Sequence, residues 1–178
     1  MVILEGLAVV PDDTVLTMTL ASILEKQLQF EKAIALYEKL LATEPDVLIA
    51  KNNLASLLTD HRTDEASLGK ARNLASKSKN SKIPYFRDTY AWASLNAGAS
   101  VEEAVVILED IVEESEKTTV YNYHLGMAYL KQGDKAVASQ YLLKAIEYSG
   151  ADTALADQVK KGLLQVAQLI PIYAMKFM

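Results

Sequence analysis

Cysteine is absent from this chain of 178 residues. Its absence excludes disulfide bonds, thiolate nucleophiles and cysteine-ligated zinc sites. Glycine and proline are also scarce, with 7 and 4 residues, and so few interruptions favour long helices over sheets. Because 51% of the residues are hydrophobic, the chain is able to bury a substantial core. The composition predicts an all-α fold.

Blocks of one charge sign are missing as well. The formal net charge is −5, and acidic and basic residues interleave, so the basic surface of a nucleic-acid-binding protein is not expected. No apolar run reaches the roughly 18 residues that a membrane-spanning helix needs. The first residues carry Glu5 and no basic cluster, which is not the pattern of a signal peptide. The compartment stays open between the cytoplasm and a bacterial periplasm or cell envelope.

A helical repeat is indicated by small residues at regular intervals. One series falls in the predicted first helices, with spacings of 34, 36 and 35 residues: Ala21, Ala55, Ala91 and Gly126. A second series marks the predicted second helices: Ala33, Ala71, Ala104 and Ala138. Small residues at fixed places let antiparallel helices approach closely while large apolar neighbours fill the remaining space. The sequence therefore predicts four helix hairpins.

The predicted hairpins occupy residues 13–150 and are not equally regular. The four hairpins are predicted at residues 14–47, 48–83, 84–118 and 119–151. Three flanking segments are predicted as well: the second helix of a truncated preceding repeat at 1–12, a capping helix at 152–168 and an apolar tail at 169–178. Between Ala55 and Ala71 lie four more residues than in hairpins 1 and 4, which we expect as a longer turn around residues 62–69. Hairpin 3 carries one extra residue near residues 98–101.

Local signals support these hairpins. Ser100 and Glu103 have the spacing of a helix-capping box. Pro84 suits the first turn of a helix. The pair Gly133 and Asp134 is typical of a position where one helix stops and the next starts.

Residues for catalysis are not evident. The two histidines lie in different hairpins; we expect His61 to be a solvated loop residue and His124 to be a groove or packing residue rather than a base. Metal-ligand spacings, nucleophile motifs and glycine-rich phosphate loops are missing from the sequence. Paired acids such as Glu102 and Glu103 have the spacing of an ordinary solvated helix face. The sequence predicts no enzyme activity, no cofactor and no metal.

The pattern resembles the tetratricopeptide repeat. Residues that match its motif in hairpin 4 are Leu125, Gly126, Tyr129, Gly133, Asp134, Ala138, Leu142 and Ala145, and in hairpin 1 they are Leu20, Ala21, Phe30, Ala33, Tyr37 and Pro45. The resemblance implies a right-handed solenoid of about four antiparallel hairpins, with an N-terminal half-repeat and a C-terminal cap. The unequal second hairpin also resembles the C-terminal part of large bacterial repeat proteins of the exopolysaccharide and cell-envelope assembly type.

A binding surface follows from the resemblance, because the first helices of such proteins line the concave face and meet ligands. The positions that we carry over as partner-binding residues are Asn52, Ser56, Tyr85, Trp92, Tyr123, Met127 and Lys131. In hairpins 3 and 4 the same face also includes Asp88, Leu95, Asn96, Val120 and Leu130. We expect Asn52 to be exposed. For Trp92 and Tyr123, packing between neighbouring hairpins remains an alternative.

The leading functional prediction is a non-catalytic scaffold that binds a peptide or a helix of a protein partner. Two alternatives remain open: a recruiting or regulatory arm of a larger enzyme, and a component of polysaccharide assembly that contacts glycan through its aromatic residues. The two apolar ends, residues 1–10 and 169–178, further predict self-association, because contiguous apolar patches usually find partners.

Overall fold

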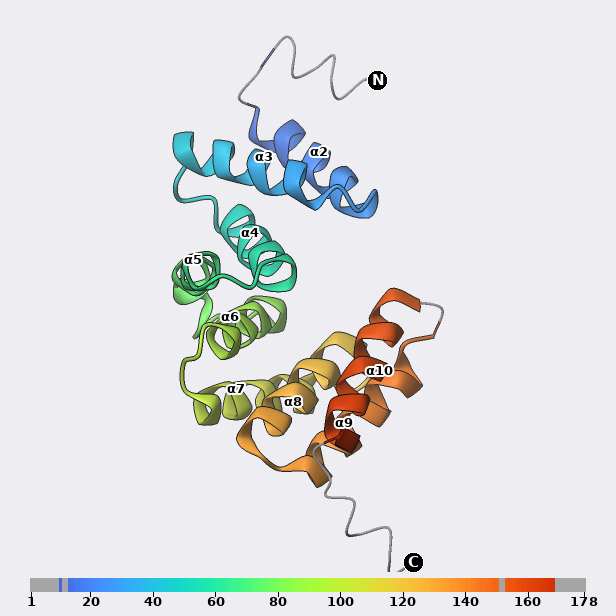
Figure 1. The fold of residues 1–178 in the computed structure, drawn as a ribbon. Coiled ribbons are helices and arrows are strands. Elements are labelled where there is room, and N and C mark those ends of the chain that lie inside the picture. Colours follow the sequence, from blue (N-terminus) through green and yellow to red (C-terminus); the bar gives the residue numbers. More distant parts are fainter. Residues whose placement is uncertain (1–9, 11–12, 151–152, 169–178) are drawn as a thin grey trace, which may run out of the picture. The chain divides into compact units, whose positions relative to one another are not determined.

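The computed structural model describes residue 10 and residues 13–150 and 153–168 (Figure 1). These residues form nine α-helices and one short 3₁₀ helix, and they contain no strand. The predicted all-α fold of antiparallel helix hairpins is therefore confirmed. The chain divides between Ser81 and Lys82 into two compact units, and each is described by itself.

The first unit contains two hairpins. Its helices are α2 (Thr14–Lys26), α3 (Phe30–Thr43), α4 (Leu48–His61), α5 (Glu65–Ala75) and the 3₁₀ helix η1 (Ser76–Ser78). The small residues of both predicted series, Ala21 and Ala33 in one hairpin and Ala55 and Ala71 in the other, are fully buried. They allow the paired helices to pack closely.

The turn of the second hairpin differs from the prediction. We expected a longer turn around residues 62–69, but α4 ends at His61 and α5 already begins at Glu65. The reason is Asp64, whose side chain accepts a hydrogen bond from the backbone N–H of Ser67 at 2.8 Å, the arrangement of a helix N-cap. The additional residues between Ala55 and Ala71 therefore lie in helices. The predicted position of His61 in a loop is also wrong, because His61 is the last residue of α4. Its ring stacks on Phe30, with the centroids 3.7 Å apart.

A buried tyrosine joins three helices of this unit. The hydroxyl of Tyr37 on α3 donates to the carboxylate of Glu25 on α2 at 2.8 Å. The same hydroxyl accepts from the side-chain amide of Asn53 on α4 at 3.0 Å. Because the Tyr37 ring is fully buried, these two bonds satisfy a polar group that would otherwise destabilise the core.

The second unit contains two hairpins and a further helix. Its helices are α6 (Pro84–Asn96), α7 (Val101–Glu114), α8 (Thr119–Gln132), α9 (Lys135–Tyr148) and α10 (Thr153–Gln168). Pro84 occupies the first turn of α6, as predicted. Ser100 caps α7 by accepting from the N–H of Glu103 at 3.2 Å. The carboxylate of Glu103 binds the Tyr90 hydroxyl at 2.9 Å.

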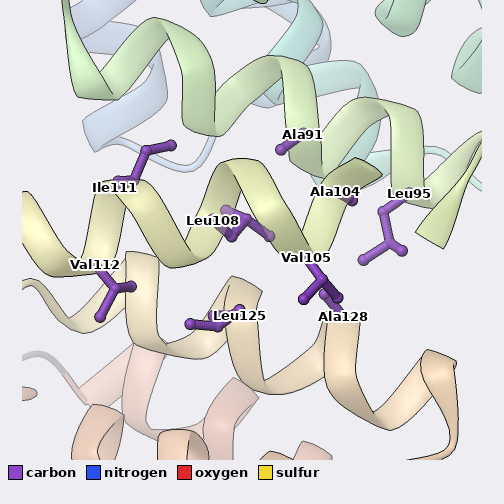
Figure 2. Packing of buried hydrophobic residues seen from close by; sticks show 9 residues of the cluster. All are labelled: Ala91, Leu95, Ala104, Val105, Leu108, Ile111, Val112, Leu125 and Ala128. Atoms are coloured by element: carbon purple, nitrogen blue, oxygen red, sulfur yellow. The ribbon is translucent and has the colours of Figure 1, made fainter. Parts of the chain in front are cut away.

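The core of the second unit lies on both sides of α7 (Figure 2). Its buried residues come from α6, α7 and α8: Ala91, Leu95, Ala104, Val105, Leu108, Ile111, Val112, Leu125 and Ala128. A second cluster joins α9 to α10 through Leu142, Val159 and Val166. The outer face of α10 carries exposed charged residues such as Lys160 and Lys161. One face of α10 is thus apolar and the other is solvated.

Two predicted segments fall largely outside the described residues. These are the half-repeat helix at residues 1–12, of which only Val10 is described, and the apolar tail at residues 169–178. In the part of the chain that is described, no helix has both the length and the apolar character needed to cross a bilayer.

Gly126 provides a test of the close helix packing. A Cβ atom at this position would lie 2.8 Å from Cγ and 2.9 Å from Cδ2 of the buried Leu142. We therefore expect Gly126→Ala to lower the free energy of unfolding by about 1–3 kcal/mol, the usual effect of overpacking. Urea unfolding followed by circular dichroism measures this change.

Gly69 is the matched control. It lies inside α5, and a Cβ there would meet nothing within 4 Å. Gly69→Ala should raise the free energy of unfolding by about 0.5–1 kcal/mol, because alanine is the better helix former. Equal effects of the two substitutions would contradict the packing argument.

Candidate functional site

A groove in the second unit is bounded by three helices. It encloses about 430 Å³ and is lined by Trp92, Leu95 and Asn96 of α6, by Met127, Leu130 and Lys131 of α8, and by Gln165 of α10. We call it the α6–α8–α10 groove. Its volume falls in the range of about 300–1,000 Å³ that is typical of ligand pockets.

The two long walls of the groove use the same positions of successive hairpins. On α6 the lining residues follow Ala91 by one, four and five positions, and on α8 they follow Gly126 by the same intervals. Positions with these spacings share one face of a helix. Trp92 and Met127 are therefore equivalent positions, 35 residues apart.

The third wall is α10, which approaches α8 closely. A Cβ atom at Gly162 would lie 3.0 Å from the sulfur of Met127, so the glycine leaves room for α10 beside this side chain. Gly162 also continues the series of small residues in the first helices, because it follows Gly126 by 36 residues. Helix α10 thus lies where the first helix of a further hairpin is expected.

The floor of the groove is apolar and its rim is polar. Leu95 is buried, and Met127 and Leu130 are half-buried. At the rim, the side-chain amide of Asn96 donates to the carbonyl oxygen of Trp92 at 2.9 Å. The Lys131 ammonium group donates to the carbonyl oxygen of Leu95 at 2.5 Å, so a positive charge is held at the C-terminal end of α6, where the helix dipole favours it.

Trp92 is held in place by a buried pair of polar side chains. Its ring stacks on His124, with the centroids 4.1 Å apart and an interplanar angle of 10°. Nδ1 of His124 lies 2.9 Å from a carboxylate oxygen of Asp88. Only 6% of His124 and 4% of Asp88 are exposed. The Tyr123 ring also contacts Trp92, at 5.8 Å between centroids, so Trp92 contacts two aromatic rings.

Tyr121 lies in the same surroundings. Burial of its phenol, together with the nearby Asp88 and Tyr85, raises the pKa of Tyr121 above its usual value. The phenol is therefore neutral at physiological pH.

The structure brings together some of the predicted binding residues. Trp92, Met127 and Lys131 line the groove, and Tyr123 contacts it through Trp92. Tyr85 is 43% exposed and does not line the groove; its ring lies beside Phe86.

Asn52 and Ser56 belong to α4 of the first unit and line no part of the groove. The expectation that Asn52 is exposed is wrong, because the residue is completely buried. It shares a face of α4 with Ala55 and Thr59, which are buried as well. Its amide nitrogen and oxygen both lack a hydrogen-bond partner among the described residues.

Gln165 lines the groove although the sequence does not predict it to, because residues 152–168 are predicted to form a capping helix with a solvated outer face. A signal was available. In the register that pairs Gly162 with Gly126, Gln165 corresponds to Tyr129, which is next to Leu130 of the predicted face. Extending the repeat by one more helix would have placed Gln165 near the predicted face.

A second hollow, of about 840 Å³, lies along α5 in the first unit and includes Lys51, Lys70 and Lys77 in its lining. Its lysines are paired with acids: Lys70 with Glu38 at 2.6 Å and Lys51 with Asp46 at 3.5 Å. Its described lining residues include no aromatic side chain. Among the described residues, no group of three or more His, Asp or Glu side chains is placed to hold a metal ion. The α6–α8–α10 groove is therefore the candidate site.

Comparisons with known proteins agree with the hairpin architecture. Residues 120–152 match the family model described as the tetratricopeptide repeat, whereas no curated protein matches the chain in sequence. A thermophilic repeat protein of this type from Thermus thermophilus is similar in structure, with a TM-score of 0.66 and 15% identity over 85% of this chain and 80% of that one.

Two further solved structures are similar. PilF of Pseudomonas aeruginosa has a TM-score of 0.61 and 14% identity, over 96% of this chain and 82% of that one. MamA of Desulfovibrio magneticus RS-1 has a TM-score of 0.57 and 14% identity, over 85% and 84% of the two chains. At these identities the likeness shows the fold alone.

The support of Trp92 by His124 is testable through stability. His124→Phe retains a flat ring next to Trp92 but removes the nitrogen that faces Asp88. The buried carboxylate then loses this partner, and we expect the free energy of unfolding to fall by about 1–3 kcal/mol. Thermal and urea unfolding of the variant measure the loss.

The control adds Asp88→Asn to the same variant. An uncharged amide is less costly to bury than a carboxylate, so the double variant should recover part of the lost stability. If His124→Phe is as stable as the parent chain, the Asp88–His124 contact does not support the wall of the groove.

Proposed function

We propose that this chain, which carries a tetratricopeptide repeat at residues 120–152 and has the fold of that family, is a non-catalytic scaffold for protein–protein interaction. In this proposal a peptide or a helix of the partner binds in the α6–α8–α10 groove. The observation that carries the proposal is the groove itself, in which two successive hairpins present equivalent residues around an apolar floor.

The chemistry of the groove suits a peptide with apolar anchor residues. Trp92 offers a large and rigid contact area, and tryptophan is among the residues that dominate the binding energy of interfaces. Met127 is flexible and adapts to side chains of different shapes. The polar rim of Asn96, Lys131 and Gln165 is placed to bind the backbone or polar side chains of the same peptide. The site is small, so we expect one or two anchor side chains to fill it.

The absence of catalysis is part of the same proposal. His124 is the histidine of the second unit, but its ring is buried against Trp92 and its Nδ1 faces Asp88. A general base must reach the proton that it abstracts, and a ring in this position does not reach a ligand in the groove. His61 belongs to the first unit and stacks on Phe30.

The identity of the partner is proposed only as a class. A protein or peptide partner fits the family fold and the apolar floor. The resemblance to envelope-assembly proteins is not tested by the structural matches and remains a prediction. A glycan ligand is the alternative that the binding experiment includes.

A substitution that fills the groove with a larger side chain tests this proposal, because it should weaken peptide binding. Peptides are selected from a random phage-displayed library on the immobilised chain, and their affinities are measured by calorimetry for the parent chain and for Gln165→Phe. Gln165 is exposed, so its replacement adds bulk to the groove without removing a core contact. We expect the substitution to weaken binding by about tenfold or more, which corresponds to about 1.4 kcal/mol.

Gln140→Phe is the matched control, because Gln140 is an exposed residue of α9 that does not line the groove. It should leave the affinity unchanged. Equal affinities for the two variants would show that the selected peptides bind elsewhere. Selection of no peptide, together with measurable binding of an oligosaccharide, would favour the glycan alternative.

A further inference from the structure

The hollow along α5 differs from the α6–α8–α10 groove in its charge. It encloses about 840 Å³, and the charged residues in its lining are three lysines and one glutamate: Lys51, Lys70, Lys77 and Glu65. The chain as a whole has a formal net charge of −5. The hollow is therefore a locally positive surface on an acidic protein, and such a surface attracts negatively charged ligands.

One face of α5 forms the length of the hollow. Its lining residues Ala66, Gly69, Lys70 and Asn73 are spaced by three and four positions, so they share this face. The face continues to Lys77 in η1, which follows α5 directly. At a rise of 1.5 Å per residue, Lys70 and Lys77 are about 10 Å apart along the helix axis. Because a Cβ atom at Gly69 would meet nothing within 4 Å, a partner is able to approach α5 closely between the two lysines.

Two of the lysines converge on one carboxylate oxygen. Lys51 reaches the hollow from α4, and only 18% of its side chain is exposed, so its packed stem restricts where the ammonium group lies. Lys77 belongs to η1 and is 74% exposed. Oδ1 of Asp46 lies 3.5 Å from Nζ of Lys51 and 4.0 Å from Nζ of Lys77.

Asp46 indicates which chemical group the hollow accepts. It precedes α4, and 88% of its side chain is exposed, so burial does not force its carboxylate against the lysines. The ammonium group of Lys70 is 2.6 Å from the carboxylate of Glu38, and both of these side chains are also exposed. Ion pairs this exposed stabilise a fold only weakly. Carboxylates of a ligand are therefore able to replace Asp46 and Glu38 at little cost.

We propose that this hollow binds an acidic segment of a protein partner, whose carboxylates displace Asp46 and Glu38 from the three lysines. The proposal goes beyond the α6–α8–α10 groove, because the hollow lies in the first unit and adds a second interaction surface to the scaffold.

The spacing of the lysines predicts the spacing of the acids in the segment. An extended peptide spans about 3.3 Å per residue, so acidic residues three positions apart match the distance of about 10 Å between Lys70 and Lys77. The lining between these lysines includes Leu74, which offers apolar contact to the segment.

The acids around the hollow favour a peptide over a nucleic acid. Glu65 lines the hollow, and Glu38 and Asp46 lie next to its lysines. These carboxylates repel a ligand that is negative along its whole length. A peptide with separated acidic residues places each carboxylate beside a lysine and leaves uncharged residues beside the acids.

The test selects phage-displayed peptides on the Gln165→Phe variant, in which the α6–α8–α10 groove is filled. We expect the selected peptides to carry acidic residues three positions apart. Their affinities are measured by fluorescence anisotropy for this variant and for the same chain with Lys70→Gln and Lys77→Gln. The two lysine substitutions should weaken binding by about fivefold or more, because two ion pairs with the peptide are lost.

Asp46→Asn should have the opposite effect. Without the carboxylate of Asp46, Lys51 and Lys77 no longer exchange one partner for another when the peptide binds. We expect the affinity to rise by about twofold to fivefold. A damaged fold does not produce tighter binding, so this variant separates the proposed role from a loss of structure.

The matched control replaces two lysines of the second unit. Lys160→Gln and Lys161→Gln change the net charge by the same amount but lie on α10, and they should leave the affinity unchanged. An equal loss of affinity in this control would show general attraction between charges and would overturn the proposal. Selection of no acidic peptide would overturn it as well.

Two other occupants are outcomes of the same experiment. A single-stranded DNA oligonucleotide that displaces the selected peptides, and that binds less tightly after Lys70→Gln and Lys77→Gln, would assign the hollow to nucleic acid. A dimer of the parent chain that dissociates on these substitutions, seen by analytical ultracentrifugation, would assign it to a second copy. Either result would overturn the proposal.

Discussion

The close approach of paired helices at one small residue is the constraint on which the structure of each hairpin depends. At Gly126 this constraint is severe, because the side chain of Leu142 occupies the space that a Cβ atom would need. Such a contact fixes the rotation of the first helix about its own axis, since any other face would bring a larger residue against Leu142. The residues one, four and five positions later then share one face of the helix. On α8 these residues are the ones that line the groove.

Much of the fold could be predicted because the same constraint leaves a mark in the sequence. The intervals between small residues located the first helices, and Pro84 marked the start of one of them. The interval of 16 residues between Ala55 and Ala71 was less informative, because an interval does not reveal whether added residues lie in a turn or in a helix. The N-cap at Asp64 decides this point. Its carboxylate starts α5 immediately after a short turn, so the added residues become helical.

The binding face could be predicted only in part. The repeat placed Trp92, Met127 and Lys131 on equivalent faces, and the structure brings these residues together. The hollow itself also depends on α10, a helix whose sequence reads as an ordinary amphipathic cap. Asn52 shows the opposite failure, because its polarity suggested exposure although its helical neighbours Ala55 and Thr59 are buried. The position of a residue on a helix face is periodic and visible in the sequence. Whether a neighbouring helix covers that face depends on tertiary packing.

The buried pair of Asp88 and His124 gives the groove a property that its apolar residues alone do not provide. Burying two polar groups costs desolvation energy, which their mutual hydrogen bond offsets only in part. The same contact holds a flat ring against Trp92, so the largest side chain of the groove is already oriented before a ligand arrives. Pre-organisation of this kind reduces the entropy lost on binding. With Trp92 fixed and Met127 adaptable, the groove is suited to apolar side chains of several shapes, and discrimination between ligands then depends on its polar rim.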